Sequence, residues 1–161
     1  MVITKIEAQK KKGRYNIYLN DAFAFGVDEA TVVKYALFKG TELTKVQIKE
    51  IQQDDCIQQA YQKALHFLNF KLRSTKEVYE KLEKLEFDDD IINEVLGKLH
   101  EQNFINDTFY AESYLNQAKF VTFKGPKSIV FDLQKKGISD KVIQTVLEGY
   151  SLKEQLENAI Q

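Results

Sequence analysis

Basic side chains recur at matching places in two parts of the chain, and they could bind an anionic partner. The set consists of Lys71, Arg73, Lys76, Lys124 and Lys127, and an offset of 51 residues carries Arg73 onto Lys124 and Lys76 onto Lys127. Repeated units that present the same charge suit a partner that is itself extended or repeating. We therefore expect these residues to line one face as partner contacts, with a merely solubilising surface as the alternative.

Other reactive side chains have plainer interpretations. Asp88-Asp89-Asp90 lacks the spacing of an EF-hand and precedes an apolar helical stripe, so helix capping is favoured over cation binding. His66 and His100 are expected to be partly buried and hydrogen-bonded rather than catalytic. Cys56 follows two aspartates, which disfavour a thiolate, and is expected to act as a small apolar filler. The sequence therefore predicts neither a catalytic residue nor a metal site.

Two further clusters resemble binding motifs. Lys124-Gly125-Pro126-Lys127 differs from a phosphate-binding loop because a helix, not a strand, is expected before it, and Pro126 suits the first position of a helix. Its helix N-terminus could still receive a carboxylate or phosphate from a partner. Lys10, Lys11, Lys12 and Arg14 form a second basic cluster on a predicted hairpin turn, where lysines also prevent edge pairing.

The elements that position these residues are predicted by an internal repeat. At the same offset of 51, Ala60–Leu96 matches Ala111–Leu147 in its apolar positions, for example Val78 with Ile129 and Leu82 with Leu133. Such spacing is typical of stacked helical units. Possible capping boxes begin at Thr44, Ser74 and Ser151, and Asp107 and Ser139 are candidate N-caps.

The start of the chain has a different pattern. Short alternating runs within Val2–Gly26, joined by tight turns at Lys11-Lys12-Gly13 and Asn20-Asp21, predict a three-stranded antiparallel meander. A helix that begins near Asp28 and ends at Gly40 should cover it, with an apolar side formed by Val32, Val33, Ala36 and Leu37. The fold class is thus mainly α, with tandem three-helix repeats preceded by a small antiparallel β meander with one helix. The predicted parts are residues 1–43, a first repeat with a long first helix at 44–106, a second repeat at 107–150 and an incomplete third at 151–161.

The composition limits the kinds of function that this chain can have. The net charge of −1 provides no overall field that would attract a polyanion, so such contacts must come from local clusters. A single cysteine, the absence of an apolar signal core in MVITKIEAQKKK and the lack of a stretch of roughly 18–20 apolar residues predict a cytoplasmic protein without a membrane span. A monomer is expected.

Three runs carry a resemblance to a known family: ALHFLNFKLRSTKEVYEKLEKL, LHEQNFINDTFYAESYL and FKGPKSIVFDLQKKGIS. In this order and spacing, together with NIYLNDAFAFGVDEATVVKY and EGYSLKEQLENAI, the chain resembles the RecX family of bacterial regulatory proteins. The features shared with the family are Arg73, Ser74, Asn106, Asp107, Phe109, Ala111, Gly125, Ile129, Leu133, Gly137 and Ile138. Most are caps, helix starts or core positions, which leaves Arg73 and its basic neighbours as contact residues.

The resemblance implies a non-enzymatic protein without a cofactor that binds the RecA recombinase filament on single-stranded DNA, lies in its groove and inhibits its activities. It places the chain in DNA repair, homologous recombination and the SOS response. The alternative is a direct DNA-binding protein that uses helix-turn-helix-like units. Two departures stand out: Glu86 replaces a glycine common in the family, which predicts a different helix ending, and Ala118–Phe123 lacks arginines. The family is longer, so a truncated chain is expected.

Overall fold

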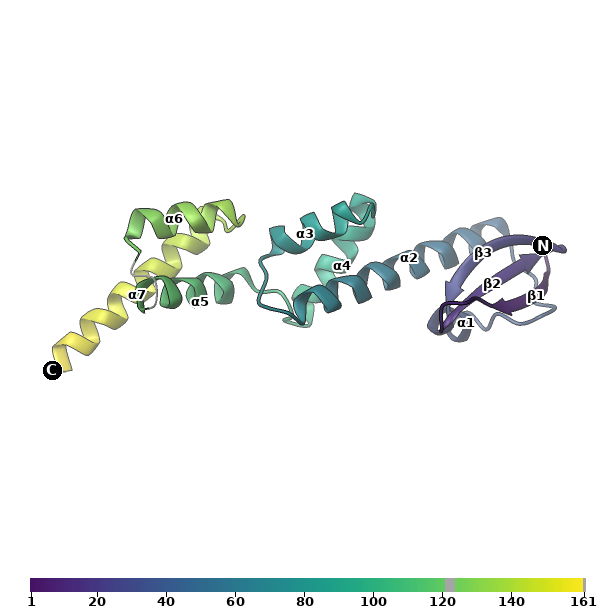
Figure 1. Ribbon diagram of the computed structural model, residues 1–161, viewed down its shortest axis with the longest axis horizontal. Coiled ribbons are helices and arrows are strands. Elements are labelled where there is room, and N and C mark those ends of the chain that lie inside the picture. The colour runs from purple at the N-terminus through teal and green to yellow at the C-terminus, as the bar shows by residue number, and fades with distance from the viewer. Residues whose placement is uncertain (121–123, 161) are drawn as a thin grey trace. The chain divides into compact units, whose positions relative to one another are not determined.

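The computed structural model describes the backbone of residues 1–120 and 124–160, and the side chains of residues 1–119 and 124–150 (Figure 1). The chain divides into two compact units, Met1–Tyr61 and Gln62–Gln161. The first contains a sheet and the second is helical among the described residues. The predicted fold class, mainly α with tandem three-helix repeats after a small β meander, is confirmed. The predicted division at residues 43, 106 and 150 remains a prediction.

The first unit begins with the predicted meander. Strands β1 (Ile3–Ala8), β2 (Arg14–Leu19) and β3 (Ala22–Asp28) form one sheet in the order β1-β2-β3, and both neighbouring pairs are antiparallel. A two-residue turn joins β2 to β3, with positive φ angles at Asn20 and Asp21. Such turns match the twist of the paired strands, and Asn and Asp tolerate this conformation. Asn20 and Asp21 therefore form the tight turn that the sequence predicts between these two strands.

The helix after the sheet differs from its prediction. Helix α1 spans only Glu29–Lys34, and Val33, expected on the apolar side, is 74% exposed. Ala36 has a positive φ of 50° and is exposed, so it ends the helix instead of packing beneath it. Leu37 is fully buried, as predicted. The predicted end of this helix at Gly40 is wrong because the chain turns at Ala36.

A second helix completes the cover of the sheet. Helix α2 (Lys45–Leu68) begins with the predicted capping box, in which Thr44 and Gln47 exchange hydrogen bonds of 2.8 and 3.2 Å. Its residue Ile51 is buried in one apolar cluster with residues of the sheet and the following loop: Ile3, Ile17, Leu19, Phe25, Val27, Leu37 and Leu43. Burying a side chain of this size contributes about 1.5–3 kcal/mol. The long helix therefore stabilises the sheet that the short helix covers only in part.

A buried polar cluster also joins α2 to the sheet. Asp55 is 4% exposed and accepts hydrogen bonds from Arg14 (3.2 Å), the backbone N–H of Asp28 (2.8 Å), Thr31 (3.1 Å) and Gln59 (2.9 Å). Arg14 also pairs with the Asp28 carboxylate at 2.7 Å. A buried charge needs such partners to offset its desolvation. Arg14 therefore has a structural position, unlike the exposed Lys10, Lys11 and Lys12.

The second unit repeats itself at the predicted offset. Helices α3 (Thr75–Lys84) and α4 (Asp89–Glu101) start 51 residues before α6 (Pro126–Lys135) and α7 (Asp140–Ile160), and α5 (Asp107–Phe120) precedes α6 (Figure 1). Matching positions are buried: Val78 and Ile129, Leu82 and Leu133, Ile92 and Ile143, Val95 and Val146. The predicted repeat is confirmed in its helix bounds and buried positions.

Four helices end in the same way, with a residue in the left-handed region. These residues are Ala36, Glu86, Asn103 and Gly137 after α1, α3, α4 and α6. In each case the next N–H bonds the carbonyl five residues earlier, as in Phe87 to Leu82 (3.2 Å) and Ile138 to Leu133 (3.0 Å). This is the Schellman ending, which usually has glycine. The prediction that Glu86 requires a different ending is wrong, because Glu86 adopts the glycine conformation itself at φ 68°.

Several local predictions need correction. The side chain of Asn106 caps α5 by accepting from the N–H of Phe109 at 3.0 Å, and Asp107 is already the first residue of that helix. Ser151 lies inside α7, so no new helix begins there. His66 and His100 are both exposed rather than partly buried. The predicted packing of Leu152, Leu156 and Ile160 lies outside the described side chains, and part of Ala118–Phe123 lies outside the described residues.

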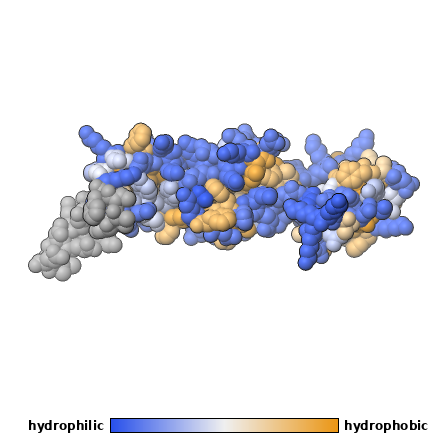
Figure 2. All heavy atoms as spheres, in the orientation of Figure 1, coloured by the Kyte–Doolittle hydropathy of each residue, from blue (hydrophilic) through white to orange (hydrophobic). Residues whose placement is uncertain are grey.

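Apolar side chains on the surface of the second unit are spread over several elements. Phe70, Phe104, Phe109 and Phe131 are each at least half exposed. Figure 2 shows a mainly hydrophilic face with separate apolar areas. Singly exposed apolar side chains are normal for a soluble protein. Charged and polar contacts therefore provide the better-defined candidate site.

Candidate partner-binding groove

The start of α3 joins the two repeats of the second unit. Ser74 is fully buried and forms the predicted capping box with Glu77. The Ser74 hydroxyl accepts from the N–H of Glu77 at 3.2 Å and donates to the carbonyl of Lys136 at 2.8 Å. Thr75 donates to Asp107 from its N–H (2.8 Å) and its hydroxyl (3.0 Å). The residues at the start of α3 thus cap their own helix and also bind the second repeat.

A close packing contact accompanies these hydrogen bonds. The Lys76 side chain lies against Gly137, so close that a Cβ placed on this glycine would be 2.5 Å from the Lys76 Cβ. The Lys76 ammonium group donates to the carbonyl of Lys135 at 3.2 Å. Gly137 has a φ of 80°, so it both ends α6 and admits this side chain. Lys76 therefore has a structural contact in addition to its predicted role.

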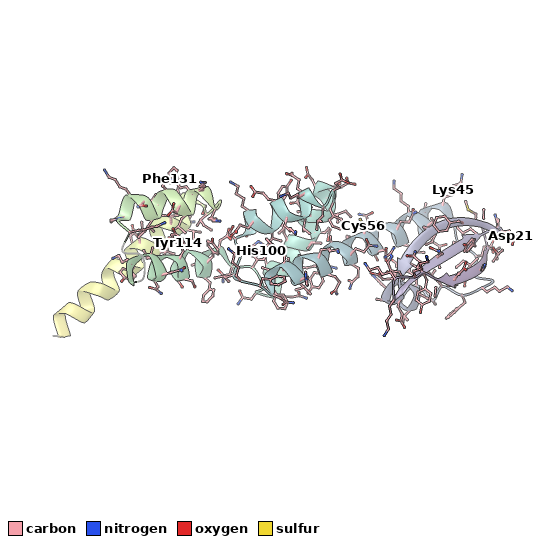
Figure 3. The ribbon with its side chains drawn as sticks, in the orientation of Figure 1. Asp21, Lys45, Cys56, His100, Tyr114 and Phe131 are labelled. Atoms are coloured by element: carbon pink, nitrogen blue, oxygen red, sulfur yellow. The ribbon has the colours of Figure 1, made fainter. Side chains whose placement is uncertain are left out.

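A charged groove of about 610 Å³ lies beside this joint. We call it the inter-repeat groove; it is lined by Lys76, Glu77 and Glu80 of α3, Tyr114 of α5, and Lys124, Asp132, Lys135 and Lys136 at and around α6. Tyr114 extends from α5 towards α6 (Figure 3) and donates a hydrogen bond to Asp132. Two of the five predicted contact residues, Lys76 and Lys124, thus line one groove.

Ion pairs partly neutralise the lysines of the groove. Lys124 lies 2.8 Å from the Asp132 carboxylate and 3.3 Å from the Tyr114 hydroxyl. Lys136 is 3.6 Å from Glu77, and Lys76 is 3.8 Å from Glu80. Four ammonium groups and three carboxylates therefore share the groove. The groove has both signs of charge rather than the concentrated positive face typical of phosphate binding.

Arg73 occupies a more covered position than the sequence suggested. Its side chain is only 16% exposed, and the guanidinium lies 3.9 Å from the centre of the Phe67 ring. The Glu77 carboxylate is 3.9 Å away, and the buried Nε has no hydrogen-bond partner among the described residues. Cation–π contact with an aromatic face stabilises such an arrangement. Arg73 thus supports the start of α3, and its predicted role as a partner contact is untested.

Lys71 and Lys127 complete the predicted set. Both side chains are exposed, and neither forms an ion pair with another residue that the structure describes. Lys127 lies in the first turn of α6, while Lys71 follows α2. The structure therefore separates the five residues into two groove residues, one covered arginine and two exposed lysines.

The groove perturbs the pKa values of its members. Hydrogen bonds with Asp132 and Tyr114 raise the pKa of Lys124, and the hydrogen bond from Lys124 lowers that of Asp132. Burial acts to raise the pKa of Glu77, but the Ser74 N–H, the Lys136 charge and the Tyr110 hydroxyl outweigh it, so this pKa is lowered. Burial and the nearby Glu77 raise the pKa of Tyr110 to about 12. The carboxylates of Glu77 and Asp132 are therefore ionised near neutral pH.

Sequence reasoning did not identify the acidic half of the groove. Glu77 belongs to the capping box predicted to begin at Ser74, and the sequence predicts no binding role for the other groove residues, which are Glu80, Tyr114, Asp132, Lys135 and Lys136. Tyr114 and Asp132 are 18 residues apart on different helices, so spacing alone does not reveal their hydrogen bond. A signal did exist for Glu80, because it stands four residues after Lys76 on one helical face.

The described residues were also compared with what a membrane-spanning helix and a metal site require. In that part of the chain no helix is long and apolar enough to cross a membrane. Across the same residues there is also no group of three or more His, Cys, Asp or Glu side chains that could hold a metal ion. Asp88 occupies the N-cap position of α4, while Asp89 accepts a hydrogen bond of 2.5 Å from Tyr79.

The geometry defines a class: a tandem three-helix repeat protein with a charged groove beside the joint between its repeats. Three family profiles match the chain: the regulatory protein RecX N-terminal domain over residues 1–44, the first three-helix domain of RecX over 60–99, and the second over 106–147. These matches include the segments that form the sheet and both repeats. The chain belongs to the RecX family.

Curated relatives and solved structures agree with these matches. A regulatory protein RecX from Leuconostoc mesenteroides is 43% identical over 98% of this chain, and one from Listeria monocytogenes is 41% identical over 99%. The chain spans 59% and 60% of the lengths of these relatives. A crystal structure of regulatory protein RecX matches with a TM-score of 0.74 at 38% identity, over 92% of this chain and 73% of that one. RecX from Lactobacillus salivarius matches at 41% identity, over 65% and 68%, with a TM-score of 0.59.

Proposed function

We propose that this chain binds the RecA recombinase filament on single-stranded DNA and inhibits its DNA-dependent activities. Membership of a family of regulatory proteins supports a regulatory role, and the observation that carries the proposal is the inter-repeat groove. The groove is lined by both repeats and contains cations and carboxylates together. Surfaces with both signs of charge give specificity towards a complementary protein surface.

The contact residues in this proposal are Lys71, Arg73, Lys76, Lys124 and Lys127. Lys124 and Lys127 lie on either side of the first residue of α6, so a partner in the groove could reach both. Lys76 contributes its ammonium group from α3, and Arg73 acts mainly by holding Glu77 in place. Each exposed charge contact contributes only about 0.2–1 kcal/mol, so binding depends on several of them together.

The rest of the proposal concerns the setting. The chain acts in the cytoplasm as a monomer, without enzymatic activity or a cofactor, and serves DNA repair, homologous recombination and the SOS response. The biological role and the lack of enzymatic activity and cofactor rest on the family resemblance, whereas the cytoplasmic location is an expectation from the sequence composition. Contact with single-stranded DNA takes place within the filament.

Direct DNA binding is the second candidate. The observation that favours it is the pair of exposed lysines, Lys71 and Lys127, without ion pairs to other described residues. Exposed lysines near helix starts can contact phosphates. Against it stand the carboxylates of the groove and the net charge of −1. Phosphate-dominated binding would weaken steeply as salt is raised, which separates it from protein recognition.

The proposed function is tested by measuring ATP hydrolysis by the Listeria monocytogenes RecA on single-stranded DNA. The chain is titrated into this assay beside the Listeria monocytogenes relative, which is 41% identical and serves as the comparison. We expect both proteins to lower the rate. A rate that stays unchanged with this chain, under conditions in which the relative inhibits, would contradict the proposal.

A further inference from the structure

Two carboxylates of the inter-repeat groove are engaged only within their own repeats among the described residues. Glu80 is on the exposed surface of α3, where its side chain is 60% exposed, and its contact with Lys76 is a long 3.8 Å. Asp132 is on α6, where it lies 2.8 Å from the Lys124 ammonium group and accepts a hydrogen bond from Tyr114 of α5, both in the second repeat. Glu77 differs from both because Ser74, Lys136 and Tyr110 engage it as part of the joint. Glu80 and Asp132 therefore need another explanation.

Their effect on the groove is electrostatic. Lys76, Lys124, Lys135 and Lys136 would together form a cluster of four ammonium groups, which is the usual composition of a phosphate-binding site. With Glu77, Glu80 and Asp132 included, the groove has a formal charge of only +1. An incoming phosphate that reached Lys124 would have to displace Asp132, whose carboxylate is 2.8 Å from the ammonium group. Like-charge contacts of this kind reject an unsuitable partner.

We infer that Glu80 and Asp132 exclude nucleic acid from the inter-repeat groove and select an extended protein segment that carries both acidic and basic side chains. Such a segment can place its cations beside Glu80 and Asp132 and its carboxylates beside the lysines that are thereby released. A nucleic-acid strand supplies only anions, so it cannot replace the ion pairs that it breaks. This inference rests on the proposed function, because it specifies the partner of the same groove.

The arrangement of lysines and carboxylates in the groove indicates the kind of partner that would bind there. The groove is lined from α3 on one side and from α5 and α6 on the other, and ion pairs lie within each side: Lys76 with Glu80, and Lys124 with Asp132. A volume of about 610 Å³ accommodates several side chains rather than a small ion. Desolvated charge pairs between partners contribute to specificity more than to raw affinity. The groove is therefore suited to recognise a particular protein surface among many anionic ones.

The test removes the two charges while it preserves shape. The double variant Glu80→Gln/Asp132→Asn is compared with the wild type and with Glu94→Gln/Glu101→Gln, which changes the net charge equally at exposed positions of α4 outside the groove. The probe is a fluorescein-labelled oligonucleotide of twenty deoxythymidines, followed by anisotropy at several salt concentrations. Far-UV circular dichroism checks the fold, and the single variant Glu80→Gln is used if the double variant is unfolded.

We expect the wild type and the α4 variant to bind the oligonucleotide weakly, and the groove variant to bind about fivefold to tenfold more tightly at low salt. Its salt dependence should steepen by roughly 0.7 in log–log slope for each phosphate newly contacted, up to about 1.4 for Lys76 and Lys124. Equal affinity of the groove and α4 variants would overturn the inference. So would tight binding by the wild type that Lys124→Glu abolishes, because the groove would then be a nucleic-acid site.

A second measurement separates this inference from the proposed function. The groove variant should also inhibit RecA ATP hydrolysis less than the α4 variant, because it lacks the carboxylates that meet the partner's cations. A wild type that fails to inhibit RecA would refute the proposed function, whereas the oligonucleotide assay contains no RecA and still decides whether the carboxylates exclude nucleic acid. Undiminished RecA inhibition by the groove variant would refute their role in partner selection.

Discussion

Replacing Gly137 with alanine should destabilise the joint between the repeats. The new Cβ would lie 2.5 Å from the Cβ and 2.6 Å from the Cδ of Lys76, well inside the contact distance of about 3.5–4.0 Å between carbon atoms. The Lys76 Cβ is attached directly to the α3 backbone, so a change of side-chain rotamer cannot move it away. Either α3 or the turn after α6 must shift.

Two terms set the size of the effect. Holding a residue other than glycine at a φ of 80° costs about 1–2 kcal/mol. Overpacking at a well-packed contact typically costs a further 1–3 kcal/mol. The free energy of unfolding should therefore fall by about 2–5 kcal/mol, as measured by urea denaturation followed by circular dichroism.

The first repeat supplies the matched control. Glu86 occupies the equivalent turn with a φ of 68° and already carries a Cβ. Glu86→Ala should therefore change the free energy of unfolding by no more than about 0.5 kcal/mol, while Glu86→Gly should raise it by about 1 kcal/mol because the backbone strain is relieved. A loss of 1 kcal/mol or less for Gly137→Ala would mean that backbone strain alone acts, and it would refute the close contact between the repeats.

Two further predictions concern the residues that hold the joint. Ser74→Ala removes both the helix cap and the hydrogen bond to Lys136, so the free energy of unfolding should fall by about 1–3 kcal/mol. The control Ser139→Ala removes a helix cap only and should lower the free energy of unfolding by about 1 kcal/mol. Equal losses in the two variants would argue against the second role of Ser74. Because its folded-state pKa is lowered, Glu77 contributes stability that is present above its unfolded-state pKa of about 4.3 and is lost as the pH falls through the folded-state value. Unfolding measured from pH 7 to pH 3 should therefore show less acid destabilisation in Glu77→Gln than in the wild type, and identical pH profiles would contradict this assignment.

Much of the helical architecture could be predicted because apolar spacing and capping act locally. The offset of 51 residues matched the apolar positions of α3 with those of α6. Thr44, Ser74 and Ser139 each cap the helix that the sequence predicted to begin after them. Tight-turn residues likewise predicted the hairpin at Asn20 and Asp21. These signals depend on residues close together in the sequence.

The helix endings were harder to predict because glycine is absent from most of them. Ala36, Glu86 and Asn103 adopt the left-handed conformation that sequence reasoning reserves for glycine. This is why α1 ends early and why Glu86 was expected to change the turn. At Asn106 and Asp107, two adjacent capping residues competed, and contact with Thr75 engages Asp107 in the joint instead.

The candidate site was only half predictable for a different reason. A repeated charge pattern identified Lys76 and Lys124, but the pairing of Lys124 with Asp132 depends on the conformation of the chain just before α6. Arg73 illustrates the limit, since its position over Phe67 makes it part of the packing although its type suggested a surface contact. The ion pair of Glu77 with Lys136 joins α3 to the residue that ends α6, and such a contact has no fixed spacing in the sequence. Only Glu80, four residues after Lys76 on the same helix, could have been found from spacing.

The measurement that tests the account most directly is binding of the labelled chain to a RecA filament assembled on single-stranded DNA with a slowly hydrolysed ATP analogue. The variant Lys124→Glu/Lys127→Glu is compared with Lys45→Glu/Lys49→Glu, which reverses two exposed lysines in the first turns of α2. We predict that the wild type and the α2 variant bind alike and that the variant Lys124→Glu/Lys127→Glu binds at least about tenfold more weakly. Absence of wild-type binding, or an equal loss in both variants, would contradict the proposal that this chain engages RecA through the inter-repeat groove.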